Sequence, residues 1–230
     1  MKLIIGSRYT DEIKELQELG CDVITFKGSK AIDDEINCHA DINVFNCNNG
    51  VLVINSDIIG EPGPYLKGFK LIECKGIKSP YPNDIKLNSA LIGKYLLCNT
   101  RFIADEITTF CKNNNIEPLH TNQGYSKCSV CVLNDNAVIT EDTAIASLLK
   151  KCQIDVLLIE KGYVSLSDKH FGFIGGASGM LNTDTLYVSG DISEHPGYND
   201  ILKFLDKHNI KLVFNKSRKL NDFGGFIRLD

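Results

Sequence analysis

The sequence predicts an α/β fold in which five ββαβ repeats close into a ring, a five-bladed α/β propeller. Five times a hydrophobic run ends in two small or polar residues and then a charged one. These endings are Gly6-Ser7-Arg8, Asn55-Ser56-Asp57, Asn99-Thr100-Arg101, Thr140-Glu141-Asp142 and Ser189-Gly190-Asp191. The charged residues are 41 to 49 residues apart, counting the interval from Asp191 through the C-terminus to Arg8. Such a period is typical of repeat architectures.

Strands are expected where short runs of apolar and β-branched residues occur. In chain order these runs are 2–5, 22–26, 43–45, 51–54, 71–74, 90–92, 95–98, 116–119, 129–133, 137–140, 154–159, 171–174, 185–188, 211–214 and 225–229. Asn134-Asp135-Asn136 is a hairpin signal between two of them. Because no strand precedes 2–5, we expect 225–229 to supply its partner and close the ring.

Helices are expected where apolar residues follow helical spacing. These segments are 11–19, 103–113, 144–151 and 198–208. Asp142 or Thr143 can cap the third of them. Gly60-Glu61-Pro62-Gly63-Pro64 leaves room for only one turn, over 65–69, in the second repeat. We therefore expect one closed domain over 1–230, with an ordinary α/β sandwich and accidental repeats as the alternative.

Composition limits the classes of partner. The chain has 230 residues, 43% of them hydrophobic, which is enough for a full core. A net charge of −4 gives no basic footprint for nucleic acid. No apolar run approaches the roughly 20 residues that span a bilayer, and the N-terminus reads as a strand instead of a signal peptide. Nine scattered cysteines are expected to be reduced thiols in a cytoplasmic protein. The oligomeric state stays open.

A closed ring of five ββαβ units resembles the pentein fold of the guanidino-group modifying enzymes. That family includes arginine and agmatine deiminases, dimethylarginine hydrolases and amidinotransferases. The resemblance covers the whole chain in repeat order and is strongest in two segments. Cys38-His39-Ala40-Asp41-Ile42-Asn43-Val44 is similar to the family's His-x-Asp strand, and residues 172–180 are similar to its glycine-rich segment. The chain also resembles bacterial pentein-fold proteins of unassigned reaction that carry similar His-Ala-Asp and Gly-Tyr-x-Lys-Cys segments.

The resemblance implies that His39 is the general acid/base and that Asp41 holds a guanidinium group, with no cofactor. The chemistry suits these residue types, because a carboxylate orients the planar guanidinium and a histidine shuttles protons while a thiolate attacks its carbon. Residues two apart in a strand share a face. We therefore expect His39 and Asp41 to point together into the central channel.

The glycine-rich segment departs from the family pattern. Aligning Gly175 and Gly176 on the family's glycines puts Gly179 where the nucleophilic cysteine would stand. The alternative interpretation of these glycines is structural, since they allow positive φ or close backbone approach.

Cys128 in the fourth repeat is the alternative nucleophile. Counting back from Asp57 and Asp142 aligns two repeats, with Gly124 opposite His39, Ser126 opposite Asp41 and Cys128 opposite Asn43. Cys128 is then expected to point into the central channel, as His39 and Asp41 do, and the neighbouring Lys127 could lower the pKa of its thiol. The competing interpretation is that Cys128 is a small buried hydrophobe in an apolar strand.

The remaining expected contacts are with substrate, and no metal is expected. We expect the substrate to be bound by Asn43, Ser126, Lys127, Gly175 and Gly176. Cys128 and Cys131 have metal-knuckle spacing, but an offset of three in a strand sends the two sulfurs to opposite faces, and no second pair follows.

Three functions remain open from the sequence. The first is a hydrolase, deiminase or amidinotransferase acting on a guanidino- or amide-type small molecule through a relocated Cys128. The second is a non-catalytic pentein that binds such a ligand. The third is a macromolecular binding ring like the ribosome anti-association factor, which the acidic balance disfavours. Gly179 favours the last two functions, whereas His39 and Asp41 favour the first two.

Overall fold

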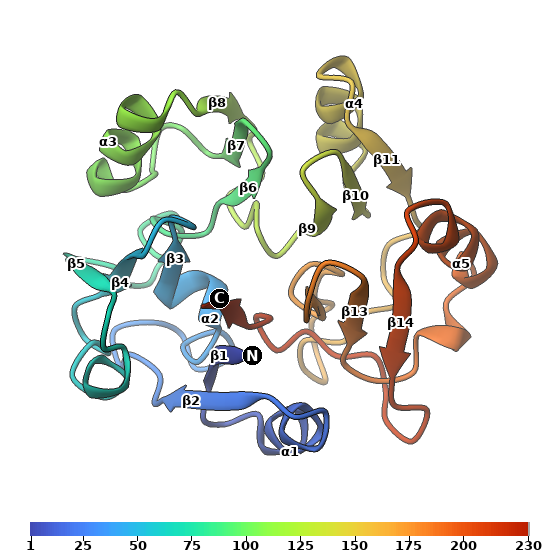
Figure 1. Ribbon diagram of the computed structural model, residues 1–230, viewed down its shortest axis with the longest axis horizontal. Coiled ribbons are helices and arrows are strands. Elements are labelled where there is room, and N and C mark those ends of the chain that lie inside the picture. Colours follow the sequence, from blue (N-terminus) through green and yellow to red (C-terminus); the bar gives the residue numbers. More distant parts are fainter. Residues whose placement is uncertain (230) are drawn as a thin grey trace.

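Five three-stranded sheets arranged in a ring form the framework of the structure, a computed structural model that describes residues 1–229 (Figure 1). The sheets are β15-β1-β2 (Ile227–Arg228, Lys2–Gly6, Asp22–Phe26), β3-β4-β5 (Val44–Asn46, Val51–Asn55, Lys70–Cys74), β6-β7-β8 (Ala90–Ile92, Tyr95–Cys98, Glu117–His120), β9-β10-β11 (Val130–Asn134, Ala137–Thr140, Asp155–Leu158) and β12-β13-β14 (Ser178–Met180, Thr185–Val188, Lys211–Phe214). In each sheet the middle strand is antiparallel to its first neighbour and parallel to its second. Each sheet is one blade, and the predicted fold class is confirmed.

The crossover between the two parallel strands of a blade carries a helix on the outside of the ring (Figure 1). The helices are α1 (Thr10–Glu18), α3 (Asp105–Asn114), α4 (Thr143–Lys151) and α5 (Tyr198–Lys207), while the second blade has only the short 3-10 helix η1 (Gly63–Tyr65). The fifth crossover also contains the 3-10 helix η2 (Ile192–Glu194). Asp142 caps α4 by accepting the backbone N–H groups of Ala144 and Ile145. None of the helices formed by residues 1–229 is long and apolar enough to cross a membrane.

The C-terminal strand closes the ring. Leu3 pairs with Arg228 and Ile4 pairs with Ile227, so β15 supplies the strand that the N-terminal repeat lacks. A polar network joins the first and fifth blades on the outer side. Arg218 pairs with Glu12 of α1, and the Tyr187 hydroxyl of β13 donates to Glu15 at 2.5 Å.

The segments leading into three first strands are helical turns, and here the strand predictions were wrong. His39 and Asp41 were expected in a strand, but Ala40–Asn43 forms α2 and the strand β3 begins at Val44. The predicted strand 171–174 lies before a turn over 174–177, in which Ala177 donates to the carbonyl of Phe173, and β12 follows. Cys128 lies in a third turn, over 126–129, which precedes β9.

These turns follow from side chains that bond to the local backbone. The amide of Asn43 donates to the carbonyls of Asn37 and His39, and the hydroxyl of Ser126 donates to the carbonyl of Gln123. Such bonds compete with strand pairing and favour turns.

Ring closure yields a stability prediction. Ile227 is 9% exposed and packs in one apolar cluster with Ile4, Val44 and Leu52 of the first two blades. Ile227→Ala should lower the free energy of unfolding by about 2–4 kcal/mol, because it removes buried methyl groups and leaves a cavity. Leu202→Ala, at an exposed position of α5, should change it by less than about 0.5 kcal/mol. Equal urea midpoints for the two variants would contradict this account of closure.

Candidate active site

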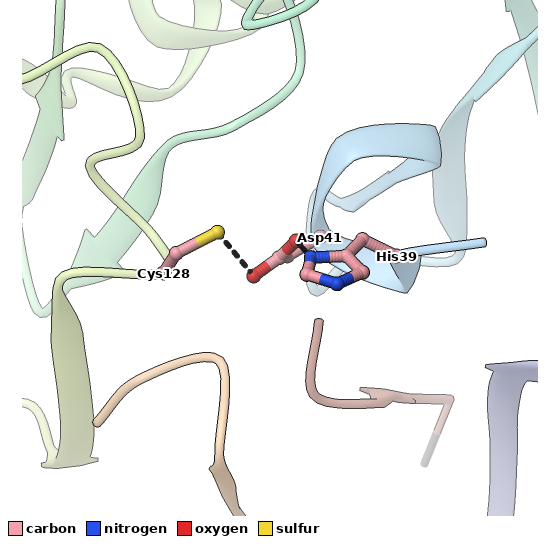
Figure 2. Close-up of side chains that lie close together, drawn as sticks. All are labelled: His39, Asp41 and Cys128. Atoms are coloured by element: carbon pink, nitrogen blue, oxygen red, sulfur yellow. Dashed lines mark hydrogen bonds and ion pairs between the residues drawn. The ribbon is translucent and has the colours of Figure 1, made fainter. Parts of the chain in front are cut away.

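The turns before the first strands meet at the inner side of the ring. His39 and Asp41 come from the α2 turn of the second blade, and Cys128 comes from the turn before β9 of the fourth blade (Figure 1). The side chains of all three are at least 97% buried, and their potential ligand atoms lie within 4.8 Å of one another. Figure 2 shows the thiol and the imidazole on opposite sides of the Asp41 carboxylate.

The sulfur of Cys128 makes two hydrogen bonds. The thiol donates to Oδ2 of Asp41 at 3.0 Å, and the amide of Asn88 donates to Sγ at 3.1 Å. Asn88 also accepts the backbone N–H of Lys127 at 2.8 Å and donates to the carbonyl of Asp41 at 3.2 Å. Asn88, from the segment before β6, thus fixes the thiol against Asp41.

The pairing of the strands corrects the alignment of the second and fourth repeats. Val44 pairs with Ile54, and Cys131 pairs with Ile139. The hairpin of the fourth repeat is therefore two residues shorter than that of the second. Cys128 lies three residues before Cys131, as Asp41 lies three residues before Val44. Cys128 is thus equivalent to Asp41, and the equivalence to Asn43 was wrong.

His39 lies between two carboxylates. Its Nδ1 is 3.9 Å from Oδ1 of Asp41 and 3.8 Å from Oδ1 of Asp222. Neither ring nitrogen has a hydrogen-bond partner among residues 1–229. Asp222 is held by the backbone N–H groups of Phe173 and Gly224, both at 2.9 Å. Two buried carboxylates therefore face one unpaired imidazole.

Burial dominates the electrostatics of this cluster. It lowers the pKa of His39, against the opposing effect of Asp222. It raises the pKa of Asp41 to about 7, although Lys127 acts in the other direction. Burial and then the carboxylates of Asp41 and Asp222 raise the pKa of Cys128 well above its usual value. In the free protein the imidazole is thus neutral and the thiol is protonated near pH 7.

The other residues expected to bind substrate have different environments. Asn43 and Ser126 are fully buried, and their side chains hold the turns described above. Lys127 is half-buried, and its Nζ lies 3.5 Å from the carbonyl of Gly175. Lys127 was expected to lower the pKa of Cys128; instead it acts on Asp41, and the net shift of the thiol is upward.

The glycines allow close backbone approach. A Cβ on Gly175 would come within 2.5 Å of the carbonyl oxygens of Lys127 and Val130, and one on Gly176 would lie 2.1 Å from Oδ1 of Asp222. Gly179 lies in β12, where a Cβ would meet the Phe226 ring at 2.6 Å. The position aligned with the family's cysteine therefore has little space for a side chain.

A cavity of about 550 Å³ on the hairpin side of the blades borders the cluster at Asp41. Asp41 and Lys127 line it together with Ser89, Ser178, Phe226 and Arg228. Its volume is in the range of small-molecule sites.

The same three side chains could hold a divalent metal. His39, Asp41 and Cys128 offer nitrogen, oxygen and sulfur donors, a set that zinc accepts. No metal was expected from the sequence, in which His39 and Asp41 lie in a different repeat from Cys128.

Asn88 and Asp222 were missed by sequence reasoning. Both lie in segments that lead into the first strand of a blade, as Asp41 and Cys128 do.

The five-bladed fold is the pentein fold, which the guanidino-group modifying enzymes share. The chain belongs to a family of unknown function, DUF6873, whose sequence profile matches residues 4–227. No curated protein matches its sequence.

Solved structures of low sequence identity share this fold. A cysteine-to-serine mutant of DDAH from Pseudomonas aeruginosa in complex with citrulline is 10% identical, with a TM-score of 0.58 over 94% of this chain and 92% of that chain. An amidinotransferase from Microseira wollei is 11% identical, with a TM-score of 0.57 over 97% and 89% of the two chains. An agmatine deiminase from C. jejuni is 13% identical, with a TM-score of 0.54 over 93% and 86%.

The charge of Asp41 yields a prediction on thiol reactivity. Asp41→Asn removes a carboxylate that raises the pKa of Cys128, so alkylation of Cys128 by iodoacetamide at pH 8 should accelerate. Each unit by which the pKa falls increases the thiolate fraction about tenfold. Peptide mass spectrometry would measure the rate, with the half-buried Cys152 as an internal control of unchanged rate. A Cys128 rate that is unchanged or slower would contradict the assigned electrostatics.

The same substitution should alter the pH dependence of stability. Because the pKa of Asp41 is about 7 in the folded chain and about 4 when unfolded, the folded state holds an extra proton between these values. Asp41 therefore lowers stability progressively as the pH rises from about 4 to about 7. The free energy of unfolding of Asp41→Asn, measured with urea, should therefore rise relative to that of wild type by up to about 1.4 kcal/mol per pH unit over this window. A difference between Asp41→Asn and wild type that stays constant from about pH 4 to about pH 7 would refute the shift.

Proposed function

We propose that this protein is a cysteine-dependent hydrolase or transferase acting on a C–N bond of a small guanidino-type molecule. The observation that carries the proposal is the contact of the Cys128 thiol with Asp41 beside an unpaired, buried His39. Nucleophile, carboxylate and proton shuttle are the three parts that this chemistry requires. The solved structures of this fold include an agmatine deiminase and an amidinotransferase, which supports the choice of substrate class.

The charge of the cluster favours a cationic ligand. Asp41 and Asp222 are buried with no cation in direct contact among residues 1–229, while a guanidinium offers N–H donors that match carboxylate oxygens. A guanidinium between the two carboxylates would neutralise the charges that raise the pKa of Cys128. Ligand binding would thereby promote ionisation of the thiol, so that the nucleophile becomes active only with substrate present.

The first half-reaction begins with transfer of the thiol proton of Cys128 through Asp41 to the neutral His39. The sulfur then forms a bond to the central carbon of the guanidinium and gives a tetrahedral adduct. The C–N bond to the leaving amine or ammonia breaks as His39 returns the proton to the departing nitrogen. Cys128 is left as a thiouronium, and no external oxidant or reductant is needed.

The second half-reaction restores the thiol. His39, again neutral, takes a proton from a water or from an acceptor amine as its oxygen or nitrogen attacks the thiouronium carbon. The C–S bond breaks and the Cys128 thiolate is reprotonated. Water gives a ureido product and hence a hydrolase, whereas an amine gives a new guanidine and hence an amidinotransferase.

Ligand binding without chemistry is the second candidate. The raised pKa of Cys128 and the glycine at position 179 support it, since both leave the free protein without a ready thiolate. The two functions differ in whether a covalent bond to Cys128 forms.

The proposal predicts a trapped intermediate on Cys128. Wild-type protein with arginine, agmatine or methylated arginines should release amine or ammonia and show a thiouronium adduct on Cys128 in quenched mass spectra. Cys128→Ser should abolish the adduct and reduce turnover at least about 1,000-fold, and His39→Asn should reduce turnover about 100- to 10,000-fold.

Two controls separate the candidates. Cys131→Ser, a buried cysteine three residues along, should keep the adduct, and EDTA should leave turnover unchanged. Stabilisation of Cys128→Ser in a thermal-shift assay without wild-type turnover would favour the binding function. Turnover that depends on added metal, or no stabilisation by any of these molecules, would contradict the proposal.

A further inference from the structure

A second cavity of about 830 Å³ lies at the other end of β10. The first cavity is lined by two residues just before β10, Asn134 and Asp135. The second is lined by the three residues just after β10, Glu141, Asp142 and Thr143. The second cavity is bounded on its other sides by residues 158–162 and 171–173. It shares no lining residue with the first cavity, and the proposed function does not use it.

Glu141 is the group in this cavity that needs a partner. It is 9% exposed, and its Oε2 accepts the backbone N–H of Ile174 at 2.9 Å. Its Oε1 is buried without a hydrogen-bond partner among residues 1–229. Burial raises the pKa of Glu141 to about 7, a sign that the carboxylate lacks a compensating cation.

The rest of the lining adds negative charge and apolar surface. Glu160 is exposed at the rim, and Lys161 beside it is the cation among the lining residues. Asp142 also lines the cavity, but its carboxylate is engaged as the cap of α4. The walls include Phe173 and Phe171, whose side chain is 71% exposed. An exposed aromatic beside a buried carboxylate matches an organic cation with a hydrocarbon part.

We propose that this cavity is a binding site for a small organic cation, with a primary ammonium or guanidinium group held by Oε1 of Glu141. The hydrocarbon part of the ligand packs against Phe171 and Phe173. The site does not include Cys128, His39 or Asp41, although the backbone N–H of Phe173 in its wall donates to Asp222.

Titration calorimetry with 2-phenylethylammonium tests the site on the full chain in phosphate buffer at pH 8. The wild type should bind it, and Glu141→Gln should weaken binding about tenfold or more, because a charged hydrogen bond is lost. Gln can still accept the N–H of Ile174, so the variant should keep its fold, as a melting curve would check. Glu160→Gln, which removes an equal charge from the rim, should change the affinity less than about threefold.

Each further outcome decides the proposal. Asp41→Asn should bind the probe as the wild type does, so failure of the Cys128 mechanism would leave this result intact. Three results would overturn the site. They are an equal affinity for neutral 2-phenylethanol, an equal loss of affinity for 2-phenylethylammonium in the Glu141 and Glu160 variants, and no binding by the wild type. Tighter binding of an acetylated and amidated Gly-Lys-Gly peptide would overturn the assignment to a free small molecule.

Discussion

The hydrogen bonds of the Asp222 carboxylate fix the geometry at the centre of the ring. By accepting the N–H groups of Phe173 and Gly224, this carboxylate joins the segments that lead into β12 and β15. Gly172 and Gly176 leave space for it, because a Cβ on either would overlap its atoms. Backbone amides stabilise a buried carboxylate without neutralising it. Asp222 therefore ties the fifth blade to the segment that leads into the closing strand and, with its Oδ1 3.8 Å from Nδ1 of His39, adds a negative charge to the site.

The same centre is electrostatically unfavourable for the free protein. Unpaired nitrogens on His39 and a carboxylate oxygen of Asp41 are enclosed without hydrogen bonds among residues 1–229, which costs folding free energy. Packing and polar contacts elsewhere offset that cost, including the Arg218, Glu12 and Glu15 network across the closure. Perturbed groups gathered in one place are typical of functional sites, because a ligand can supply the interactions that the fold leaves out.

Much of the fold could be predicted from the sequence, and less of the site. The five endings gave the repeat order, and the absent partner of 2–5 gave the closing strand, because both depend on local apolar patterns. The helical turns at Asp41 and Cys128 could not be predicted this way, since they depend on local side-chain bonds and on glycine contacts with distant segments. The alignment of Cys128 with Asn43 assumed hairpins of equal length, and only strand pairing revealed the two-residue difference. Asn88 and Asp222 carry no motif, so their roles emerge only when the blades meet.

The ring also explains how Cys128 of the fourth repeat reaches Asp41 of the second. Each blade sends one segment toward the axis before its first strand, and these segments carry Asp41, Asn88, Cys128, Gly176 and Asp222. Because the segments converge, a side chain from any blade can come within bonding distance of a side chain from another, as the contact of Cys128 with Asp41 demonstrates across 87 residues of chain. The chemistry is then set by which residue type each repeat contributes, while the sheets remain unchanged. A cysteine in one repeat can therefore contact a carboxylate of another without a change of fold.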